Sequence, residues 1–282
     1  ITRNIASLLS KARALESEGI TTYIYTGSYG GPTATLTGKP VSDLALIDKV
    51  IGIGEVAIAD YRSSYPTTQL LKELSSEAVI GGMLGAKAGV VHIHVGDGKA
   101  GISQLFELVE EYDFPINMFV PTHLNRNKEL FEQAIKFARI GGYIDLTAGE
   151  KTGKGFSVPD ALNILVNSGI NMEKVTVSSD GNGSIPESGN GMGVGKVKQL
   201  FDDIRNSVIN KGIAFDTVLK TVTSNVAKVL KVYPRKGALS LGRDADILIL
   251  NKNNLTLHTV IAKGEILVSN GKAVKKGKYE ER

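Results

Sequence analysis

The sequence predicts an α/β protein built on a parallel sheet, and three observations support this. Strand-like and helix-like segments alternate over most of the 282 residues. Each strand-then-helix unit takes about 30 residues, which is enough for a helical crossover between two parallel strands. Polar and charged residues follow the strands where the chain turns toward the next helix. We expect six such units. A (β/α)8 TIM-type barrel needs eight, so two strand-then-helix units of such a barrel are missing.

The predicted elements follow from the spacing of apolar residues and from residues that typically begin or end a helix. The helix over 128–140 has Leu130, Phe131 and Ala134 at helical spacing. The helix over 159–168 has Ser157 as a candidate N-cap and Gly169 as its stop. The other predicted helices are residues 4–17, 41–50, 67–87, 102–112, 194–210 and 217–232. Short apolar or β-branched runs predict strands at residues 20–26, 51–60, 89–95, 116–120, 143–147 and 175–177.

The pattern changes after residue 232. Short strands are expected at residues 238–250, 257–261 and 265–268, joined by turns of Asn, Gly and Lys. Such hairpin-like spacing predicts a small antiparallel sheet. We therefore expect two domains, a barrel over residues 1–232 and β-sandwich strands over residues 233–282.

Composition excludes several classes of function. There is no cysteine, so disulfides and thiol chemistry are excluded and any metal must be held by His and carboxylates. The formal net charge is +4, and the basic run at 272–278 has no interleaved aromatics that would favour nucleic-acid binding. Lys87 interrupts the longest apolar run, so no membrane span is expected. With no signal peptide visible, we expect a cytoplasmic location. Because Ile1 stands next to a helical pattern, we expect a piece of a longer polypeptide.

Several residues with catalytic or ligating side chains fall at or just beyond predicted strand ends. The carboxyl ends of parallel strands converge on one site, so His94, His123 and Asp180 could meet there. Two imidazoles and a carboxylate suit zinc or a similar divalent ion. Alternatively, Asp180 caps the next helix. The complete candidate set is Tyr29, Glu55, Arg62, His94, His123, Arg126 and Asp180.

These residues together resemble the amidohydrolase superfamily, and within it the isoaspartyl (β-aspartyl) dipeptidases. The most specific motifs are Pro-Thr-His-Leu-Asn-Arg-Asn at 121–127 and Ser-Ser-Asp-Gly-Asn-Gly-Ser at 178–184. His-Val-Gly-Asp at 94–97 and Thr-Gly-Ser-Tyr at 26–29 agree with them. The resemblance covers nearly the whole chain. It implies a TIM-type barrel of which strands 3–8 are present, followed by the C-terminal part of a β-sandwich.

The resemblance also implies an activity and roles for residues. The activity is hydrolysis of the β-aspartyl bond of a small dipeptide by a metal-activated hydroxide, in a zinc enzyme with two divalent ions that forms homo-oligomers. His94 and His123 would hold the second ion, and Asp180 would bind the first and act as general base and acid. Tyr29 would polarise the scissile carbonyl. The residues expected to bind substrate are Tyr29, Arg62, Arg126 and Ser184.

The sequence departs from the family pattern at the metal site. The family's H-x-H metal pair lies at the end of the first barrel strand, which would precede Ile1. His92 does not replace it, because His94 and the residues after it match the fifth strand; we expect His92 one layer deeper in the barrel and hydrogen-bonded there. Most relatives bridge the metals with a carbamylated lysine, whereas the matching strand here offers Glu55. Its shorter side chain requires a closer backbone, which Gly52 and Gly54 could allow.

Two other functions remain open from the sequence. A cyclic-amide hydrolase, such as a hydantoinase or dihydroorotase, would use the same metal ligands. A non-catalytic scaffold with an amidohydrolase-like fold would follow if the first-strand metal ligands were absent. Each of Arg62 and Arg126 could also form an ordinary surface ion pair, and Glu55 could be an ordinary carboxylate at the end of a strand.

Overall fold

The parallel sheet is present, and its strands follow one another in chain order. The computed structural model describes residues 4–150, 153–186, 192–277 and 280. Four strands pair in the order β1-β2-β3-β4, and β5 pairs with β6, all of them parallel. The bounds are β1 (Ile24–Thr26), β2 (Val50–Ile58), β3 (Val90–Val95), β4 (Phe119–Thr122), β5 (Ile144–Thr147) and β6 (Val175–Ser178). The predicted α/β fold with a parallel sheet is thereby confirmed.

The two groups of strands adjoin between β4 and β5. The backbone N–H of Leu124 donates to the carbonyl of Asp145 at 3.3 Å. The side chain of Asn125 donates to the carbonyl of Thr147 at 3.1 Å, and the N–H of Thr147 donates back to the Asn125 side chain at 2.8 Å. The ends of all six strands are therefore held around one centre, where the side chains that follow β4 and β5 can meet.

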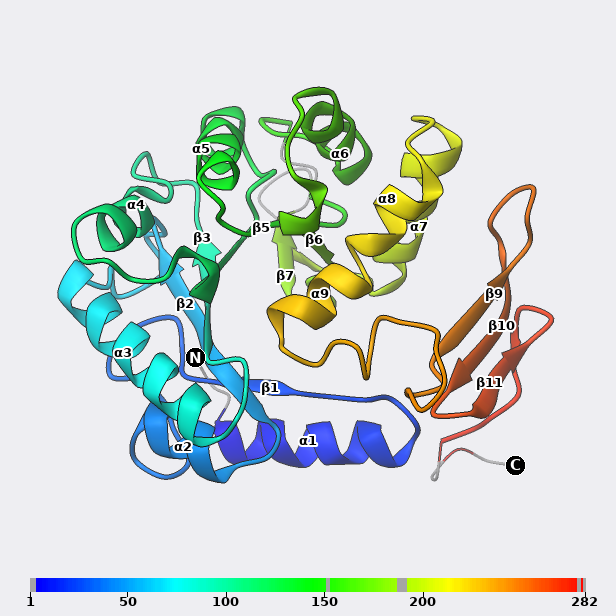
Figure 1. Ribbon diagram of the computed structural model, residues 1–282, viewed down its shortest axis with the longest axis horizontal. Helices are drawn as coiled ribbons and strands as arrows, with labels where there is room; N and C mark the ends of the chain where they lie inside the picture. Colours follow the sequence, from blue (N-terminus) through cyan, green and yellow to red (C-terminus); the bar gives the residue numbers. More distant parts are fainter. Residues whose placement is uncertain (1–3, 151–152, 187–191, 278–279, 281–282) are drawn as a thin grey trace.

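Helices cover the outer face of these strands (Figure 1). The predicted N-cap is present, because the side chain of Ser157 accepts from the N–H of Asp160. Asn127, which was not predicted as a cap, accepts from the N–H of Leu130 at 2.8 Å. The bounds are α1 (Ile5–Ser17), α2 (Pro40–Leu46), α3 (Thr68–Leu84), α4 (Ser103–Glu110), α5 (Lys128–Arg139), α6 (Val158–Asn167), α7 (Lys198–Ile209), α8 (Phe215–Lys220) and α9 (Ser224–Val229). The core between helices and strands is apolar and includes Phe119, Phe131 and Phe137, all nearly inaccessible to solvent.

The helix predicted over residues 217–232 is wrong in one respect, because it is divided into α8 and α9. The hydroxyl of Thr221 donates to the carbonyl of Val218 at 2.7 Å, and that of Thr223 donates to the carbonyl of Leu219 at 2.8 Å. Such bonds compete with the helical pattern for backbone acceptors. The carbonyl of Thr221 instead accepts from the N–H of Val177 at 3.1 Å, which ties the break to strand β6.

The C-terminal strands form a separate antiparallel sheet in the order β12-β11-β10-β9, at one side of the molecule (Figure 1). Its bounds are β9 (Ile247–Leu250), β10 (Leu257–Ala262), β11 (Glu265–Ser269) and β12 (Lys272–Ala273). The strand expected over 238–250 is confined to its last four residues. A further hairpin, β7 (Ser184–Pro186) with β8 (Met192–Val194), was not predicted and follows the Asp180 loop.

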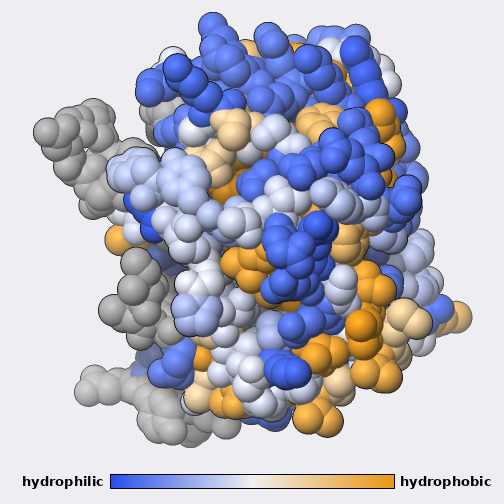
Figure 2. Space-filling view, turned by 90° about the vertical axis from the view of Figure 1, so that its left-hand side faces the viewer, coloured by the Kyte–Doolittle hydropathy of each residue, from blue (hydrophilic) through white to orange (hydrophobic). Residues whose placement is uncertain are grey.

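One side of the molecule exposes apolar side chains of α2 and α3. Figure 2 shows hydrophobic residues among charged ones on the side where α3 lies. Leu46, Met83 and Leu84 are 76%, 77% and 71% exposed. Among the described residues, no helix has the length and apolar character that a membrane crossing requires.

A buried carboxylate braces the loop between β1 and α2, which carries Tyr29. Asp43 is fully buried and accepts from the hydroxyls of Thr26 and Thr37, and from the backbone N–H groups of Leu36 and Thr37, at 2.5 to 2.9 Å. If the Asp43 carboxylate were removed, these four donors would all lose their acceptor. Each unsatisfied buried donor costs about 1–3 kcal/mol.

We therefore expect Asp43→Ala to lower the free energy of unfolding by about 3 kcal/mol or more, measured by urea denaturation. Asp48→Ala is the matched control, because the Asp48 side chain is 67% exposed and pairs with the exposed Arg13. The control should stay within about 0.5 kcal/mol of the wild type. An Asp43→Ala protein as stable as the control would contradict the proposed bracing role.

Candidate active site

Three of the predicted metal ligands lie together where β2, β3 and β4 end. Glu55 is in β2, His94 is the penultimate residue of β3, and His123 follows β4 directly. Glu55 Oε1 lies 3.3 Å from His94 Nδ1 and 3.7 Å from His123 Nε2. One ligand atom from each of the three residues can be chosen so that all lie within 4.8 Å of one another. The parallel strands thus bring these side chains together from positions far apart in the sequence.

The electrostatic interactions in this group favour an ionised Glu55 and a protonated His123. Burial alone would raise the pKa of Glu55, but the facing imidazoles of His123 and His94 outweigh it and hold that pKa far below its usual range. Burial would lower the pKa of His123, but Glu150 and Glu55 raise it to about 9. A carboxylate and two imidazoles, both imidazoles buried, form a donor set that fits a divalent ion such as zinc. Binding the ion would require His123 to release its proton.

The backbone beside Glu55 approaches its neighbour as closely as the sequence analysis predicted. A Cβ added at Gly54 would lie 2.8 Å from the Cβ of His92, and one at Gly52 would lie 2.5 Å from the carbonyl oxygen of Val90. Any side chain at these two positions would push β2 away from β3. Glycine is therefore needed to hold Glu55 at its distance from His94.

His92 lies apart from the three-residue group, inside the ring of strands. Its ring stacks on that of Tyr25 with centroids 5.1 Å apart. Its Nδ1 is buried and has no hydrogen-bond partner within the part of the chain that the structure describes. Burial is also the main cause that lowers the pKa of His92. This placement agrees with the interior position expected for His92, whereas the expected hydrogen bond is missing at Nδ1 within the described residues.

The far side of the His94 ring contacts a carboxylate that the sequence analysis did not select. Asp60 Oδ2 lies 3.0 Å from His94 Nε2. Arg62 binds this carboxylate through Nε at 3.0 Å and Nη2 at 2.6 Å, and its backbone N–H donates to it at 2.8 Å. Burial would raise the pKa of Asp60, but the hydrogen bonds from Arg62 hold it well below its usual range.

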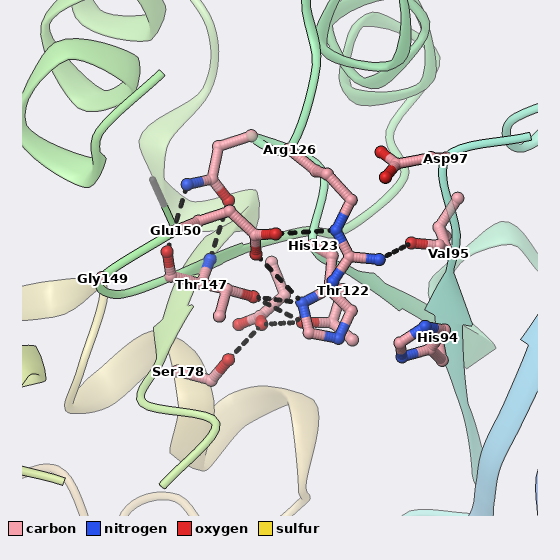
Figure 3. A network of polar contacts seen from close by, with 12 residues as sticks. His94, Val95, Asp97, Thr122, His123, Arg126, Thr147, Gly149, Glu150 and Ser178 are labelled. Carbon is pink, nitrogen blue, oxygen red and sulfur yellow. Dashed lines mark hydrogen bonds and ion pairs between the residues drawn. The ribbon is translucent and has the colours of Figure 1, made fainter. Parts of the chain in front are cut away.

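His123 has a corresponding arrangement on its far side (Figure 3). Its Nδ1 lies 2.9 Å from the hydroxyl of Thr147 and 3.4 Å from Glu150 Oε2. Arg126 donates from Nε to Glu150 at 2.7 Å and from Nη1 to the carbonyl of Val95 at 2.9 Å. Arg126 is only 8% exposed, so it forms a buried ion pair rather than the surface pair considered from the sequence.

Asp60 and Glu150 were missed because their partners come from other strands. Asp60 follows β2 and meets His94 of β3; Glu150 follows β5 and meets His123 beyond β4. A usable signal was present, since Asp60 is the last residue of one predicted strand and Glu150 lies three residues after another. Selecting every Asp and Glu within about three residues of a strand end would have found them.

Asp180 stands in the loop after β6 with a left-handed backbone, at φ 44°. Its carboxylate lies over Gly183, where an added Cβ would come within 2.2 Å of Oδ1. Burial is the largest cause that raises the pKa of Asp180. His123 also has a positive φ, of 64°. Positive φ is uncommon outside glycine, and such residues gather at functional sites. Asp180 is outside the group of three ligands that lie within 4.8 Å.

All the predicted site residues except His123 line one cavity of about 1670 Å³. The hydroxyl of Tyr29 lies 3.0 Å from His94 Nδ1, and burial raises the pKa of Tyr29, so the hydroxyl stays protonated. The Glu55 and His94 side chains line the cavity beside it. The other predicted residues that line the cavity are Arg62, Arg126, Asp180 and Ser184.

Comparisons with known proteins agree on the type of enzyme. A sequence model of the amidohydrolase family matches residues 154–267. The chain is 42% identical to β-aspartyl dipeptidase of Fervidobacterium islandicum AW-1, solved in complex with a β-Asp-Leu dipeptide. That match has a TM-score of 0.92 and covers 99% of this chain and 74% of the other. A second structure of the same enzyme matches with a TM-score of 0.89, also at 42% identity, over 99% of this chain and 72% of the other.

A more distant match concerns the fold alone. A D-hydantoinase structure matches with a TM-score of 0.60 at 15% identity, covering 99% of this chain and 77% of the other. At that identity the match shows a shared architecture. It carries no information about which amide bond is cleaved.

Proposed function

This chain belongs to the β-aspartyl dipeptidases of the amidohydrolase family, and from that premise we propose that it hydrolyses the β-aspartyl amide bond of small dipeptides. The observation that carries the proposal is the meeting of Glu55, His94 and His123 beside the cavity that Asp180 also lines. A bound divalent ion would lower the pKa of the attacking water and would polarise the scissile carbonyl. The remaining chemistry falls to the side chains around it.

Asp180 is the proposed proton carrier. As the C–O bond forms at the scissile carbonyl, its carboxylate takes the proton of the attacking water. It then delivers that proton to the amine nitrogen as the C–N bond breaks. The burial that raises the pKa of Asp180 brings that pKa closer to neutral pH, which favours transfer in both directions. The hydroxyl of Tyr29 donates to the carbonyl oxygen as negative charge develops there.

Arg62, Arg126 and Ser184 are the proposed substrate-binding residues. Arg62 uses Nε and Nη2 for Asp60, while its Nη1 has no partner among the described residues. The Arg62 side chain is 42% exposed and lines the cavity, so Nη1 can bind a substrate carboxylate. Arg126 is more deeply buried and would act from the wall of the cavity.

Three further properties belong to this proposal. We propose that the metal is zinc and that the natural enzyme uses two ions, because carboxylate and imidazole donors without thiolates suit zinc. We propose a homo-oligomer, for which the apolar side chains of α2 and α3 offer a contact face. We propose a cytoplasmic location, which a sequence without cysteine suits.

The function is tested by assaying the full-length protein on three substrates. We expect release of leucine from β-Asp-Leu, at least about 100-fold less from α-Asp-Leu, and no ring opening of dihydroorotate. A chelator should abolish the activity and added Zn²⁺ should restore it. Faster hydrolysis of dihydroorotate than of β-Asp-Leu would favour the cyclic-amide hydrolase. No turnover of any of the three by the metal-loaded protein would favour the scaffold.

A further inference from the structure

Both histidines of the candidate metal site have their two ring nitrogens facing carboxylates. One nitrogen of each ring faces Glu55, namely Nδ1 of His94 and Nε2 of His123. The opposite nitrogen faces a second carboxylate, Asp60 for His94 and Glu150 for His123. Each second carboxylate is in turn paired with an arginine. The same arrangement is thus built twice, from different strands.

The contact between Asp60 and His94 is the more sharply defined of the two. The two atoms are 3.0 Å apart, and both side chains are almost completely buried, at 3% and 4% exposure. The position of the carboxylate is fixed by Arg62, which binds it from its backbone N–H and from two guanidinium nitrogens. A carboxylate held in this way cannot turn away from the ring.

An ionised carboxylate only accepts hydrogen bonds. Nε2 of His94 faces Asp60 at 3.0 Å and is therefore assigned the hydrogen, whereas Nδ1 lies farther from Glu55, at 3.3 Å, and can accept from the hydroxyl of Tyr29 at 3.0 Å. In a neutral imidazole the other nitrogen, Nδ1, then has the lone pair. Nδ1 is the atom that faces Glu55 and Tyr29, on the side where a metal ion would be bound. A carboxylate behind a histidine ligand fixes its tautomer and orientation in this way.

We propose that Asp60 is a positioning residue that fixes His94 as the Nε2–H tautomer and so presents Nδ1 as the ligand atom, with Arg62 holding Asp60 in place. This inference rests on the proposed function for the role of the metal. The orientation of the ring, however, is a property of this chain's own side chains. Arg62 consequently has two tasks, since the same guanidinium that fixes Asp60 also faces the substrate cavity.

The first test reads the tautomer directly. Protein labelled with ¹⁵N in histidine has four imidazoles, and the signals that disappear in His94→Gln belong to His94. In the wild type, with or without Zn²⁺, we expect the hydrogen of neutral His94 on Nε2. In Asp60→Ala we expect a mixture of the two tautomers. Asp60→Ser is the second variant, to be used if the alanine protein fails to fold, because its hydroxyl is too short to reach the ring.

The second test measures the affinity for Zn²⁺ by competition with a chromophoric chelator. Loss of such a carboxylate behind a ligand typically weakens metal binding by about 10- to 100-fold. We expect a loss in this range for Asp60→Ala and a smaller one for Asp60→Asn, whose amide oxygen still accepts from Nε2. Asp48→Ala is the control, since its exposed carboxylate pairs with Arg13, and the variant should bind Zn²⁺ like the wild type.

The outcomes separate this inference from the proposed function. If Asp60→Ala retains a pure Nε2–H tautomer and wild-type Zn²⁺ affinity, the positioning role is wrong even if the enzyme hydrolyses β-Asp-Leu. If the wild type binds Zn²⁺ but cleaves no β-aspartyl bond, the proposed function fails while the tautomer measurement still decides the role of Asp60. A wild-type His94 with its hydrogen on Nδ1 overturns the inference outright.

Discussion

Asp180→Asn is expected to reduce kcat for β-Asp-Leu by about 10²- to 10⁴-fold with little change in KM, because the amide can neither take a proton from water nor deliver one to the leaving amine. Asparagine is the right substitution at this position. Residue 180 has φ 44°, a backbone conformation that Asp and Asn adopt more readily than other residues with a side chain. The size and the loop geometry are then preserved, and only the proton chemistry is lost.

The measurement needs a control for folding and one for metal content. Asp202→Asn is the matched variant, because Asp202 is a partly exposed carboxylate of α7 that pairs with Lys198. It should leave kcat, KM and thermal stability unchanged. Zn²⁺ content should be determined for both variants, since Asp180 is also a proposed metal ligand. A metal-loaded Asp180→Asn enzyme with near-normal kcat would rule out Asp180 as the proton carrier.

Strand positions were predictable from sequence because they depend on local patterns. The β-branched run at 175–177 was placed as a strand and lies within β6. The hairpin of β7 and β8 was not predictable, because Ser184 and Val194 pair with each other across residues that carry no strand pattern. The division of α8 from α9 depends on the bond between Thr221 and Val177, a contact with another element that periodicity does not contain.

The candidate site was predictable in its ligands and not in its supporting residues. His94 and His123 could be selected because two imidazoles and the carboxylate of Asp180 stand at the ends of three parallel strands, which converge on one site. The arginines illustrate the limit. Arg62 and Arg126 were assigned to substrate from the resemblance, whereas their contacts with Asp60 and Glu150 depend on side-chain positions in three dimensions. One carboxylate cannot be distinguished from another by spacing alone, so Asp60 and Glu150 were passed over.

Glu55→Gln is expected to abolish both metal binding and activity. Glu55 is the side chain that both histidines face, and their proximity holds its pKa far below the usual range. It is therefore ionised at any pH at which the enzyme would work. Glutamine has the same shape but no charge, and its NH2 group cannot bind a cation. We expect the Zn²⁺ content of the purified variant to fall to background, and β-Asp-Leu hydrolysis with it.

The same substitution separates a metal ligand from an ordinary strand-end carboxylate. If Glu55 only contributed to stability, Glu55→Gln would lower the thermal midpoint but retain Zn²⁺ and turnover. The metal-free variant should lose stability in either case, because two buried imidazoles lose a carboxylate partner, so the response to Zn²⁺ is the deciding measurement. If Glu55 is a ligand, only the wild type should gain stability on addition of Zn²⁺, since an ion that binds the folded state stabilises it. Equal stabilisation of both proteins by Zn²⁺ would remove Glu55 from the metal site.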